Sequence, residues 1–196
     1  MNAQEAHFEA LYAASDDPWH VRDAWYEQRK RAMLLASLDR AHYRHAFEPG
    51  CGNGEMTSAL AERCDRVLAC DGAASAVAAA RRRVAPQANA RVVIDQRRLP
   101  QDWPDAAASF DLILVSELGY YFDPQAWQGI VRRMVTSLEP GGMLLMCHWR
   151  HPFDDRLATT DAVHDAAHAA PELTSRLHHV EPDFLCDGWL RDPSNS

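Results

Sequence analysis

A glycine-rich loop, Glu48-Pro49-Gly50-Cys51-Gly52-Asn53-Gly54, is the feature that most restricts the fold of this chain. It follows residues 43–48, which are predicted to form a strand, and precedes residues 55–63, which are predicted to form a helix. Glycine adopts positive φ angles and lets a ligand touch the main chain, so such a loop at a strand end can form the floor of a nucleotide-like site. On its own, the pattern also fits a tight strand-to-helix turn.

Strand-like and helix-like runs alternate along the rest of the chain. Further strands are predicted at 66–71, 91–95, 110–116 and 143–149, and further helices at 73–84 and 124–138. This alternation predicts an α/β fold with a doubly wound, mostly parallel sheet, because each crossover helix covers one face of the sheet. After a helix near 161–169, the runs at 174–180 and 183–190 are joined too tightly for a crossover and should form an antiparallel hairpin.

The length of 196 residues suits one domain rather than two. Helical spacing at 3–12 and 24–38 predicts two helices ahead of the first strand. We therefore expect residues 1–40 to form a lid, residues 41–191 to form the core and residues 192–196 to be a disordered tail.

The charge balance argues against some classes of partner. The chain has 28 acidic side chains against 20 Lys and Arg, a formal charge of −8, which disfavours nucleic acid. The five cysteines are scattered without a C-x-x-C pair, so neither a disulfide framework nor a thiolate metal site is expected. The first residues lack the basic start and apolar stretch of a signal peptide, and no apolar run is long enough for a membrane span. We expect a soluble, cytoplasmic protein with no membrane partner.

Acidic residues around the glycine loop indicate the kind of ligand. Asp71 ends the second strand, where a carboxylate can accept ribose hydroxyls, and Asp95 ends the third, within reach of an adenine amine. A surface acid and a turn residue are the alternatives for these two. Glu55 stands where a dinucleotide-binding loop has its third glycine and would repel a pyrophosphate, whereas Glu48 suits a cation. S-adenosylmethionine, with an ammonium, a sulfonium and no phosphate, fits these charges better than NAD.

Several segments resemble known families. The E-x-G-x-G-x-G loop, Asp71, Asp95 and the segments Phe110-Asp111-Leu112-Ile113 and Leu138-Glu139-Pro140-Gly141-Gly142 resemble class I methyltransferases over residues 43–150. A narrower resemblance, to the nodulation protein S family, rests on Asp17-Pro18-Trp19, Trp25-Tyr26-Glu27-Gln28-Arg29-Lys30, Ser116-Glu117-Leu118-Gly119-Tyr120-Tyr121 and His148-Trp149-Arg150-His151-Pro152. The resemblance implies strand order 3-2-1-4-5-7-6 and methyl transfer to an amine, in that family the free amino group of a deacetylated chitin oligosaccharide.

The chemistry of methyl transfer needs alignment rather than a covalent nucleophile. An amine acceptor must lose its proton, and Glu117 and His148, at the ends of the fourth and fifth strands, are the candidate catalytic residues. A structural hydrogen bond is the alternative for each. The candidate substrate-binding residues are Tyr120, Tyr121, Trp149 and His151. His148 and His151 have no carboxylate or thiolate triad nearby, so no metal is expected.

The candidate cofactor-binding residues come from the lid and from the strand ends. They are Trp19, Tyr26, Arg29, Glu48, Gly50, Cys51, Gly52, Gly54, Asp71, Asp95 and Ser116. Arg29 or Lys30 would pair with the carboxylate of the cofactor, although an amphipathic helix with an exposed basic edge fits the same residues.

Together these features predict a small-molecule N-methyltransferase that uses S-adenosylmethionine and releases S-adenosylhomocysteine. Three alternatives remain open: a small-molecule O-methyltransferase, an NAD-dependent oxidoreductase and a non-catalytic adenosine-binding subunit. The residues do not identify the acceptor or the oligomeric state.

Overall fold

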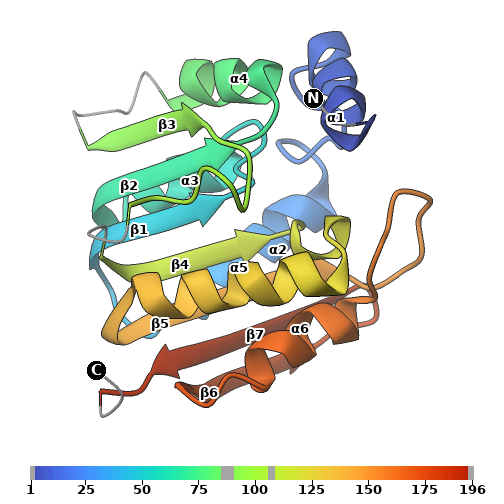
Figure 1. Cartoon of the computed structure of the whole chain (residues 1–196). Helices are drawn as coiled ribbons and strands as arrows, with labels where there is room; N and C mark the ends of the chain where they lie inside the picture. The colour runs from blue at the N-terminus through green and yellow to red at the C-terminus, as the bar shows by residue number, and fades with distance from the viewer. Residues whose placement is uncertain (1–2, 85–90, 106–108, 194–196) are drawn as a thin grey trace.

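The computed structural model describes residues 3–84, 91–105 and 109–193. Its elements in chain order are α1 (Ala3–Ala14), α2 (Trp25–Ala36), β1 (Tyr43–Pro49), α3 (Glu55–Ala61), β2 (Cys64–Asp71), α4 (Ala74–Val84), β3 (Val92–Gln96), β4 (Phe110–Ser116), η1 (Gly119–Tyr121), α5 (Pro124–Ser137), β5 (Leu138–Trp149), α6 (Thr160–His168), β6 (Leu173–Val180) and β7 (Phe184–Arg191). In the described part of the chain, strands and helices alternate from β1 to β3, and β4 and β5 are separated by η1 and α5 (Figure 1). No helix lies between β3 and β4 among the described residues.

The strands form one seven-stranded sheet in the order β3-β2-β1-β4-β5-β7-β6. Strands β1 to β5 run parallel to one another, whereas β7 runs antiparallel to both β5 and β6. The predicted fold class, strand order and terminal hairpin are therefore confirmed. Parallel strands bring their carboxyl ends to one edge of the sheet, so the residues that follow β1, β2, β4 and β5 meet there.

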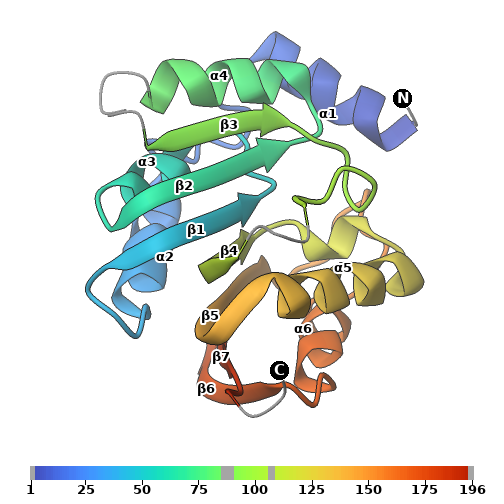
Figure 2. The ribbon, with the colours of Figure 1, turned by 60° about the vertical axis from the view of Figure 1, so that its left-hand side comes forward.

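The central strand β4 is buried on both faces. Ile113 and Val115 belong to an apolar cluster with α5 and α6, and Leu112 and Leu114 belong to a second cluster with α2. Figure 2 shows α5 and α6 on one side of the sheet and α2 and α3 on the other. A strand covered on both faces needs apolar residues at every position, which is why its sequence is a continuous apolar run.

Strand β5 begins five residues earlier than predicted. Helix α5 ends at Ser137, and Leu138 is already extended, with φ −74° and ψ 141°, and pairs with Phe110 of β4. The register between β4 and β5 then shifts, and Gly141 takes a positive φ of +75°. The Gly-Gly pair therefore lies in an irregular part of the strand rather than at the end of the helix.

The first helix lies beside α4, at the edge of the sheet where the strands β2 and β3 end (Figures 1 and 2). Among the described residues, no helix combines the length and the apolar content of a membrane span. All five cysteines are buried and free. In the tail predicted from residue 192, Asp192 donates its amide to the carbonyl of Glu172 at 2.8 Å, and residues 194–196 lie outside the described residues.

Candidate active site

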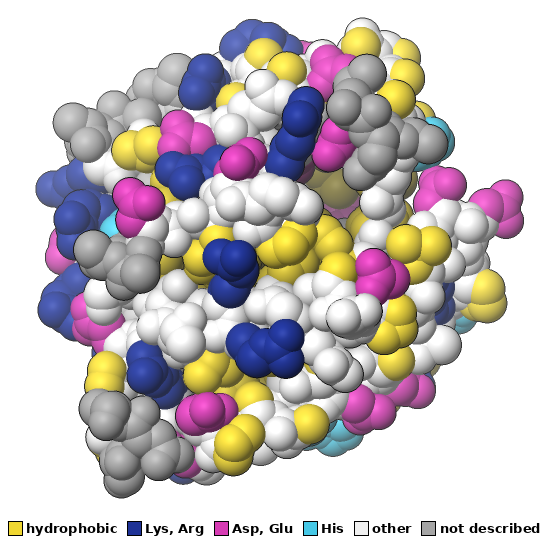
Figure 3. All heavy atoms as spheres, in the orientation of Figure 1, with side chains coloured by type: hydrophobic (Ala, Val, Ile, Leu, Met, Phe, Trp, Pro, Cys, Tyr) yellow, Lys and Arg dark blue, Asp and Glu magenta, His cyan; other side chains and the backbone are white. Residues whose placement is uncertain are grey.

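A cavity of about 1400 Å³ lies at the carboxyl edge of the sheet. Its wall includes residues of α1, α2, the glycine loop, the end of β4 and the segment that follows β5. The predicted site residues in this wall are Trp19, Tyr26, Glu48, Gly50, Cys51, Gly52, Asp71, Ser116, Glu117, Tyr120, Tyr121 and Trp149. Figure 3 shows a hollow below α1 in which apolar side chains are visible. The predictions at 29, 54, 95, 148 and 151 fall outside this wall.

The glycine loop needs glycine at two positions for different reasons. Gly52 has φ +52°, and a Cβ there would lie 2.5 Å from the hydroxyl of Tyr12, so the loop and α1 close tightly on each other. Gly54 has φ +82°, and a Cβ would lie 2.9 Å from the Cα of Ala80 in α4. Gly54 therefore serves the packing of α3 against α4, and its predicted cofactor contact is not seen in the cavity wall.

The carboxylate of Asp71 lies under the loop. It accepts hydrogen bonds from the amides of Gly52 at 3.0 Å and Ala73 at 2.9 Å. Burial raises its pKa, and these backbone hydrogen bonds oppose the rise. Because a carboxylate oxygen accepts more than one hydrogen bond, Asp71 retains acceptor capacity toward the cavity.

Asp95 does not line the cavity. Its carboxylate pairs with Arg97 at 2.9 Å, and the segment that follows, with Arg97, Leu99 and Pro100, lines the cavity instead. The side of the site predicted to receive adenine is therefore formed by residues 97–102. The carboxylate of Asp95 is held by Arg97, and its predicted contact with adenine stays a prediction.

Glu48 is a buried acid with no cation beside it among the contacts described for it. The hydroxyl of Thr57 donates to its carboxyl group at 2.6 Å. Burial raises the pKa of Glu48 to about 8, and the hydrogen bond from Thr57 only partly opposes this. A positively charged ligand group in the cavity would favour the ionised form and oppose that shift.

The surroundings of Glu55 differ from those assumed in the sequence analysis, where it was treated as an uncompensated negative charge. It accepts from Arg22 at 2.9 Å and from Arg83 at 2.7 Å, so its charge is balanced by two guanidinium groups. The premise that Glu55 repels a pyrophosphate is therefore weakened, because its negative charge is already compensated within the protein.

Glu117 is held in the cavity wall by three hydrogen bonds. One carboxylate oxygen accepts from the ammonium of Lys30 at 2.7 Å, and the other accepts from the amide of Trp149 at 2.9 Å and from the hydroxyl of Tyr120. Its backbone has φ +55°, in the left-handed region that costs a non-glycine residue roughly 1–2 kcal/mol. Strain of this kind, held in place by several contacts, is typical of functional sites.

Lys30 supplies the cation for this cluster. It is 4% exposed and also lies 2.9 Å from Glu27. Burial lowers the pKa of Lys30, but the carboxylates of Glu117 and Glu27 outweigh burial and leave the pKa above its ordinary value. The ammonium group is therefore charged and occupied by two carboxylates.

His148 lies behind the cavity wall rather than in it. Its side chain is 0% exposed, outside the cavity wall, and its Nε2 accepts the amide hydrogen of Gly119 at 2.9 Å. Burial lowers the pKa of His148 well below its ordinary value. An imidazole whose free lone pair is already used and which does not reach the cavity cannot take a proton from an acceptor there.

Aromatic rings line the wall beyond Glu117. Tyr121 and Phe153 lie with ring centroids 5.7 Å apart, and Tyr26 meets Trp149 edge-on at 5.3 Å. The hydroxyl of Tyr26 is buried with no hydrogen-bond partner in the described structure. His151 is exposed and pairs with Asp183 at 2.8 Å, so its predicted substrate contact is not made in the cavity wall.

One of the two predicted basic residues of α2 lies in the cavity wall. Arg29 points to the β6–β7 turn and forms two hydrogen bonds with Glu181, both at 2.6 Å, whereas Lys30 faces the cavity. Of the two predicted partners for the cofactor carboxylate, Arg29 is thus directed away from the cavity, whereas Lys30 lines the cavity with its ammonium group held by Glu117 and Glu27. Sequence reasoning also missed Phe8 and Tyr12, which line the cavity from α1 and contact Trp19 with their rings. Only their helical spacing could have indicated an inward face.

A comparison with protein families places the fold in a known group. The model of the methyltransferase domain family matches residues 46–142. A crystal structure of a candidate methyltransferase from Pseudomonas syringae is 42% identical, with a TM-score of 0.75, and covers 86% of this chain and 100% of that one.

Nodulation protein S is similar to this chain in sequence. The protein from Rhizobium tropici is 34% identical over 135 residues, which are 67% of this chain and 55% of that protein. The protein from Sinorhizobium fredii is 32% identical and is covered to 60%. The chain thus spans less than two thirds of the length of these relatives. The crystal structure of the N-methyltransferase NodS from Bradyrhizobium japonicum, in complex with S-adenosylhomocysteine, matches with a TM-score of 0.85 over 97% of this chain at 24% identity, a likeness of fold.

Proposed function

The chain belongs to the methyltransferase domain family, and from this premise we propose that it transfers a methyl group from S-adenosylmethionine to the amino group of a small molecule. The observation that carries the proposal is Glu117, a carboxylate fixed by three donors in the wall of the cavity. Similarity to nodulation protein S, whose crystal structure from Bradyrhizobium japonicum is described as that of an N-methyltransferase, supports an amine as the acceptor.

The cavity offers suitable partners for each part of the proposed cofactor. Glu48 is a buried acid without a cation and suits the ammonium group. Asp71 suits the ribose hydroxyls, and the hydroxyl of Tyr26 is a buried polar group without a partner. The close approach of Tyr12 to Gly52 places α1 directly against the glycine loop, at one end of the proposed cofactor site. We further propose that residues 1–40 act as a lid, since α1 and α2 both contribute to the wall.

When bound, the cofactor would supply a methyl group attached to a positively charged sulfur. This sulfur is the leaving group and becomes a neutral thioether. The uncharged amine forms the new bond to carbon with its lone pair, the carbon–sulfur bond breaks with its electrons left on sulfur, and the nitrogen then releases one proton. Glu117 accepts a hydrogen bond from the amine N–H, aligns the lone pair with the methyl group and receives the proton. Lys30 and Tyr120 keep the carboxylate in place.

The size and lining of the cavity support an acceptor of oligosaccharide or similar size. Sites for one drug-sized ligand are roughly 300–1,000 Å³, whereas this cavity is about 1400 Å³, which leaves room for a second molecule beside the cofactor. Tyr121, Trp149 and Phe153 offer flat faces on which a sugar ring can stack. An amino sugar, such as the free amino end of a deacetylated chitin oligomer, fits both features.

Transfer of labelled methyl groups to matched acceptors tests the proposal. Chitin oligomers with one free amino group are compared with the same oligomers fully acetylated, which differ only in that nitrogen. We expect label on the free amine alone, and loss of transfer in Glu117→Gln with the fold retained. Label on both oligomers indicates O-methylation, and no label on any amine in a wider panel contradicts the proposal. Loss of transfer in Asp71→Ala excludes a contaminating enzyme.

A further inference from the structure

A row of buried side chains connects β7 with the turn that follows β4. Asp187 of β7 accepts from His164 Nδ1 of α6 at 2.7 Å, and His164 Nε2 lies 3.0 Å from His148 Nδ1 of β5. His148 Nε2 in turn lies 2.9 Å from the amide nitrogen of Gly119. The three side chains are 0%, 1% and 0% exposed, and none of them lines the cavity.

The two ends of this row fix the direction of every hydrogen bond. The amide of Gly119 can only donate, so His148 Nε2 accepts and carries no hydrogen. A neutral His148 then has its hydrogen on Nδ1 and donates it to His164 Nε2. His164 therefore carries its hydrogen on Nδ1 and donates to the carboxylate of Asp187. Both imidazoles are neutral Nδ1–H forms, and burial, which lowers the pKa of His148, favours this state.

The amide at the end of the row belongs to a tightly enclosed turn. A Cβ at Gly119 would lie 2.4 Å from Val163 and 2.9 Å from Trp127, so the main chain is packed directly against α5 and α6. Gly119 begins the short helix η1, and the next residue, Tyr120, donates its hydroxyl to Glu117. A shift of this turn therefore moves the group that holds Glu117.

We infer that Asp187, His164 and His148 are positioning residues, which hold η1 so that Tyr120 keeps Glu117 in the geometry needed for methyl transfer. This inference rests on the proposed function for its consequence in catalysis. None of the three residues touches a reacting atom. Their role is to satisfy the Gly119 amide in one orientation, because an unpaired buried amide would move toward another acceptor.

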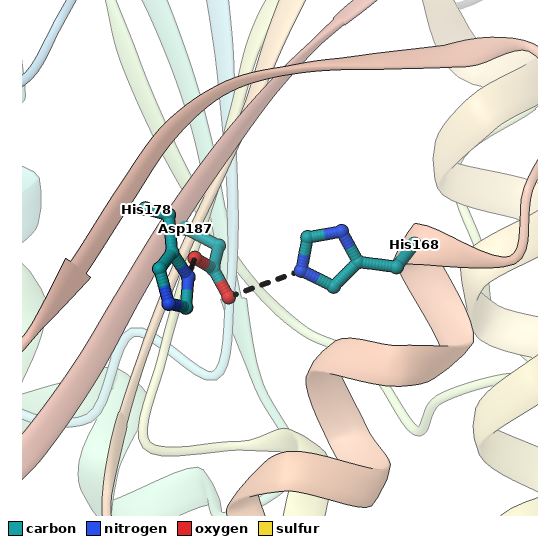
Figure 4. Close-up of side chains that lie close together, drawn as sticks. All are labelled: His168, His178 and Asp187. Atoms are coloured by element: carbon teal, nitrogen blue, oxygen red, sulfur yellow. Dashed lines mark hydrogen bonds and ion pairs between the residues drawn. The ribbon is translucent and has the colours of Figure 1, made fainter.

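A bound metal ion is the competing explanation for the histidines that surround the carboxylate of Asp187. His168 Nε2 and His178 Nδ1 lie 3.4 Å and 2.7 Å from the oxygens of Asp187, a spacing that could hold an ion (Figure 4). However, the indole of Trp189 donates to His168 Nδ1 at 3.2 Å, which places the hydrogen of a neutral His168 on Nε2. A metal would need the lone pair of that Nε2. The surrounding imidazoles therefore act as further donors that fix Asp187.

Nitrogen-15 NMR of the histidine side chains tests the row without any assay of activity. We expect His148 and His164 to show a protonated Nδ1 and a bare Nε2, and addition of zinc to leave the melting temperature unchanged. A His148 with its hydrogen on Nε2 overturns the inference, and so does a zinc-dependent rise in melting temperature that His168→Ala abolishes.

A matched pair of variants tests the effect on the reaction. In His148→Gln the side-chain oxygen can still accept from Gly119, whereas His148→Leu has no acceptor. We expect kcat to fall roughly tenfold or more in His148→Leu and in Asp187→Asn, and to recover largely in His148→Gln, with the Kd of S-adenosylhomocysteine unchanged in all three. His42→Ala, which removes an exposed histidine that pairs with Asp65 and lies outside the row, should keep the wild-type kcat.

Equal kcat values for His148→Leu and His148→Gln, in folded proteins, contradict the inference. If the wild-type protein methylates no acceptor, the proposed function fails, while the NMR spectra still decide whether the row exists with these hydrogen positions.

Discussion

Glu48 is the residue whose charge should depend most strongly on what occupies the cavity. Its carboxyl group is buried, receives one hydrogen bond from Thr57, and has a pKa of about 8 instead of the ordinary 4.5. Between these two pH values the folded protein holds a proton that the unfolded chain has released. The stability that comes from this group is complete below pH 4.5 and is lost as the pH rises to about 8.

We therefore predict that the free energy of unfolding falls with rising pH through this window, with a contribution from Glu48 of at most about 1.4 kcal/mol per pH unit. Glu48→Gln should remove this part of the slope. Denaturant titrations of both proteins at several pH values measure it. Saturating S-adenosylhomocysteine should also flatten the slope of the wild-type protein, because its ammonium group favours the ionised acid. Identical slopes for the wild type and Glu48→Gln would mean that Glu48 does not titrate in this range.

A comparison of Asp71 with Asp95 gives a second test at the residue scale. Both residues end a predicted strand, but their side chains have different surroundings in the structure. Asp71 lines the cavity, whereas Asp95 pairs with Arg97 outside the wall. In Asp71→Asn one oxygen becomes a donor that faces the amides of Gly52 or Ala73. We expect the Kd of S-adenosylhomocysteine, measured by calorimetry, to rise about tenfold or more, the loss of one charged hydrogen bond. Asp95→Asn should change it less than about threefold. Equal losses would restore Asp95 as a ligand contact.

Two neighbouring residues of helix α2, Arg29 and Lys30, are positively charged, but one faces the surface and the other faces the cavity. Arg29 pairs outward with Glu181, and this pairing lowers the pKa of Glu181 to about 2, whereas Lys30 points inward between Glu27 and Glu117. The step of one residue turns the side chain by roughly a quarter of a helical turn, which is enough to move it from the surface to the cavity.

This geometry predicts opposite outcomes for two substitutions in α2. Lys30→Met leaves two carboxylates without their shared cation, so kcat should fall roughly tenfold or more and the melting temperature should drop. Arg29→Ala removes an exposed ion pair and should keep kcat and the Kd of S-adenosylhomocysteine close to the wild-type values. Steady-state kinetics and thermal melts of both variants decide the matter. A larger loss of cofactor affinity in Arg29→Ala than in Lys30→Met would favour the original prediction of Arg29.

The elements could be predicted from the sequence where burial is uniform. The run at Phe110–Ser116 is apolar at every position because β4 is covered on both faces, and its bounds agree with the structure. At the end of β5, the sequence did not indicate which of the neighbouring side chains faces the cavity. Cys147 packs with α2, His148 points toward α6, and Trp149 reaches the cavity, because successive side chains of a strand face opposite sides. Which side holds the site depends on the packing of distant elements.

At the scale of the whole molecule, residue patterns predicted the α/β class and a site at the carboxyl edge of the sheet. The resemblance to known families implied the strand order. The contacts of α1 and α2 with the rest of the site could not be predicted from such patterns. Tyr12 of α1 meets Gly52, forty positions later in the chain, and Lys30 of α2 meets Glu117. No local pattern encodes such pairs, since they depend on how α1 and α2 are placed over the sheet. The row from Asp187 to Gly119 joins four elements and is hidden for the same reason.

The most direct test of the central claim, that this cavity is an S-adenosylmethionine site, is a calorimetric titration of the purified chain with S-adenosylhomocysteine and, separately, with NAD. We predict saturable binding of one S-adenosylhomocysteine per chain, weakened in Asp71→Asn, and no binding of NAD at the same concentrations. Binding of NAD without binding of S-adenosylhomocysteine would contradict the assignment of the cavity and the mechanism built on it.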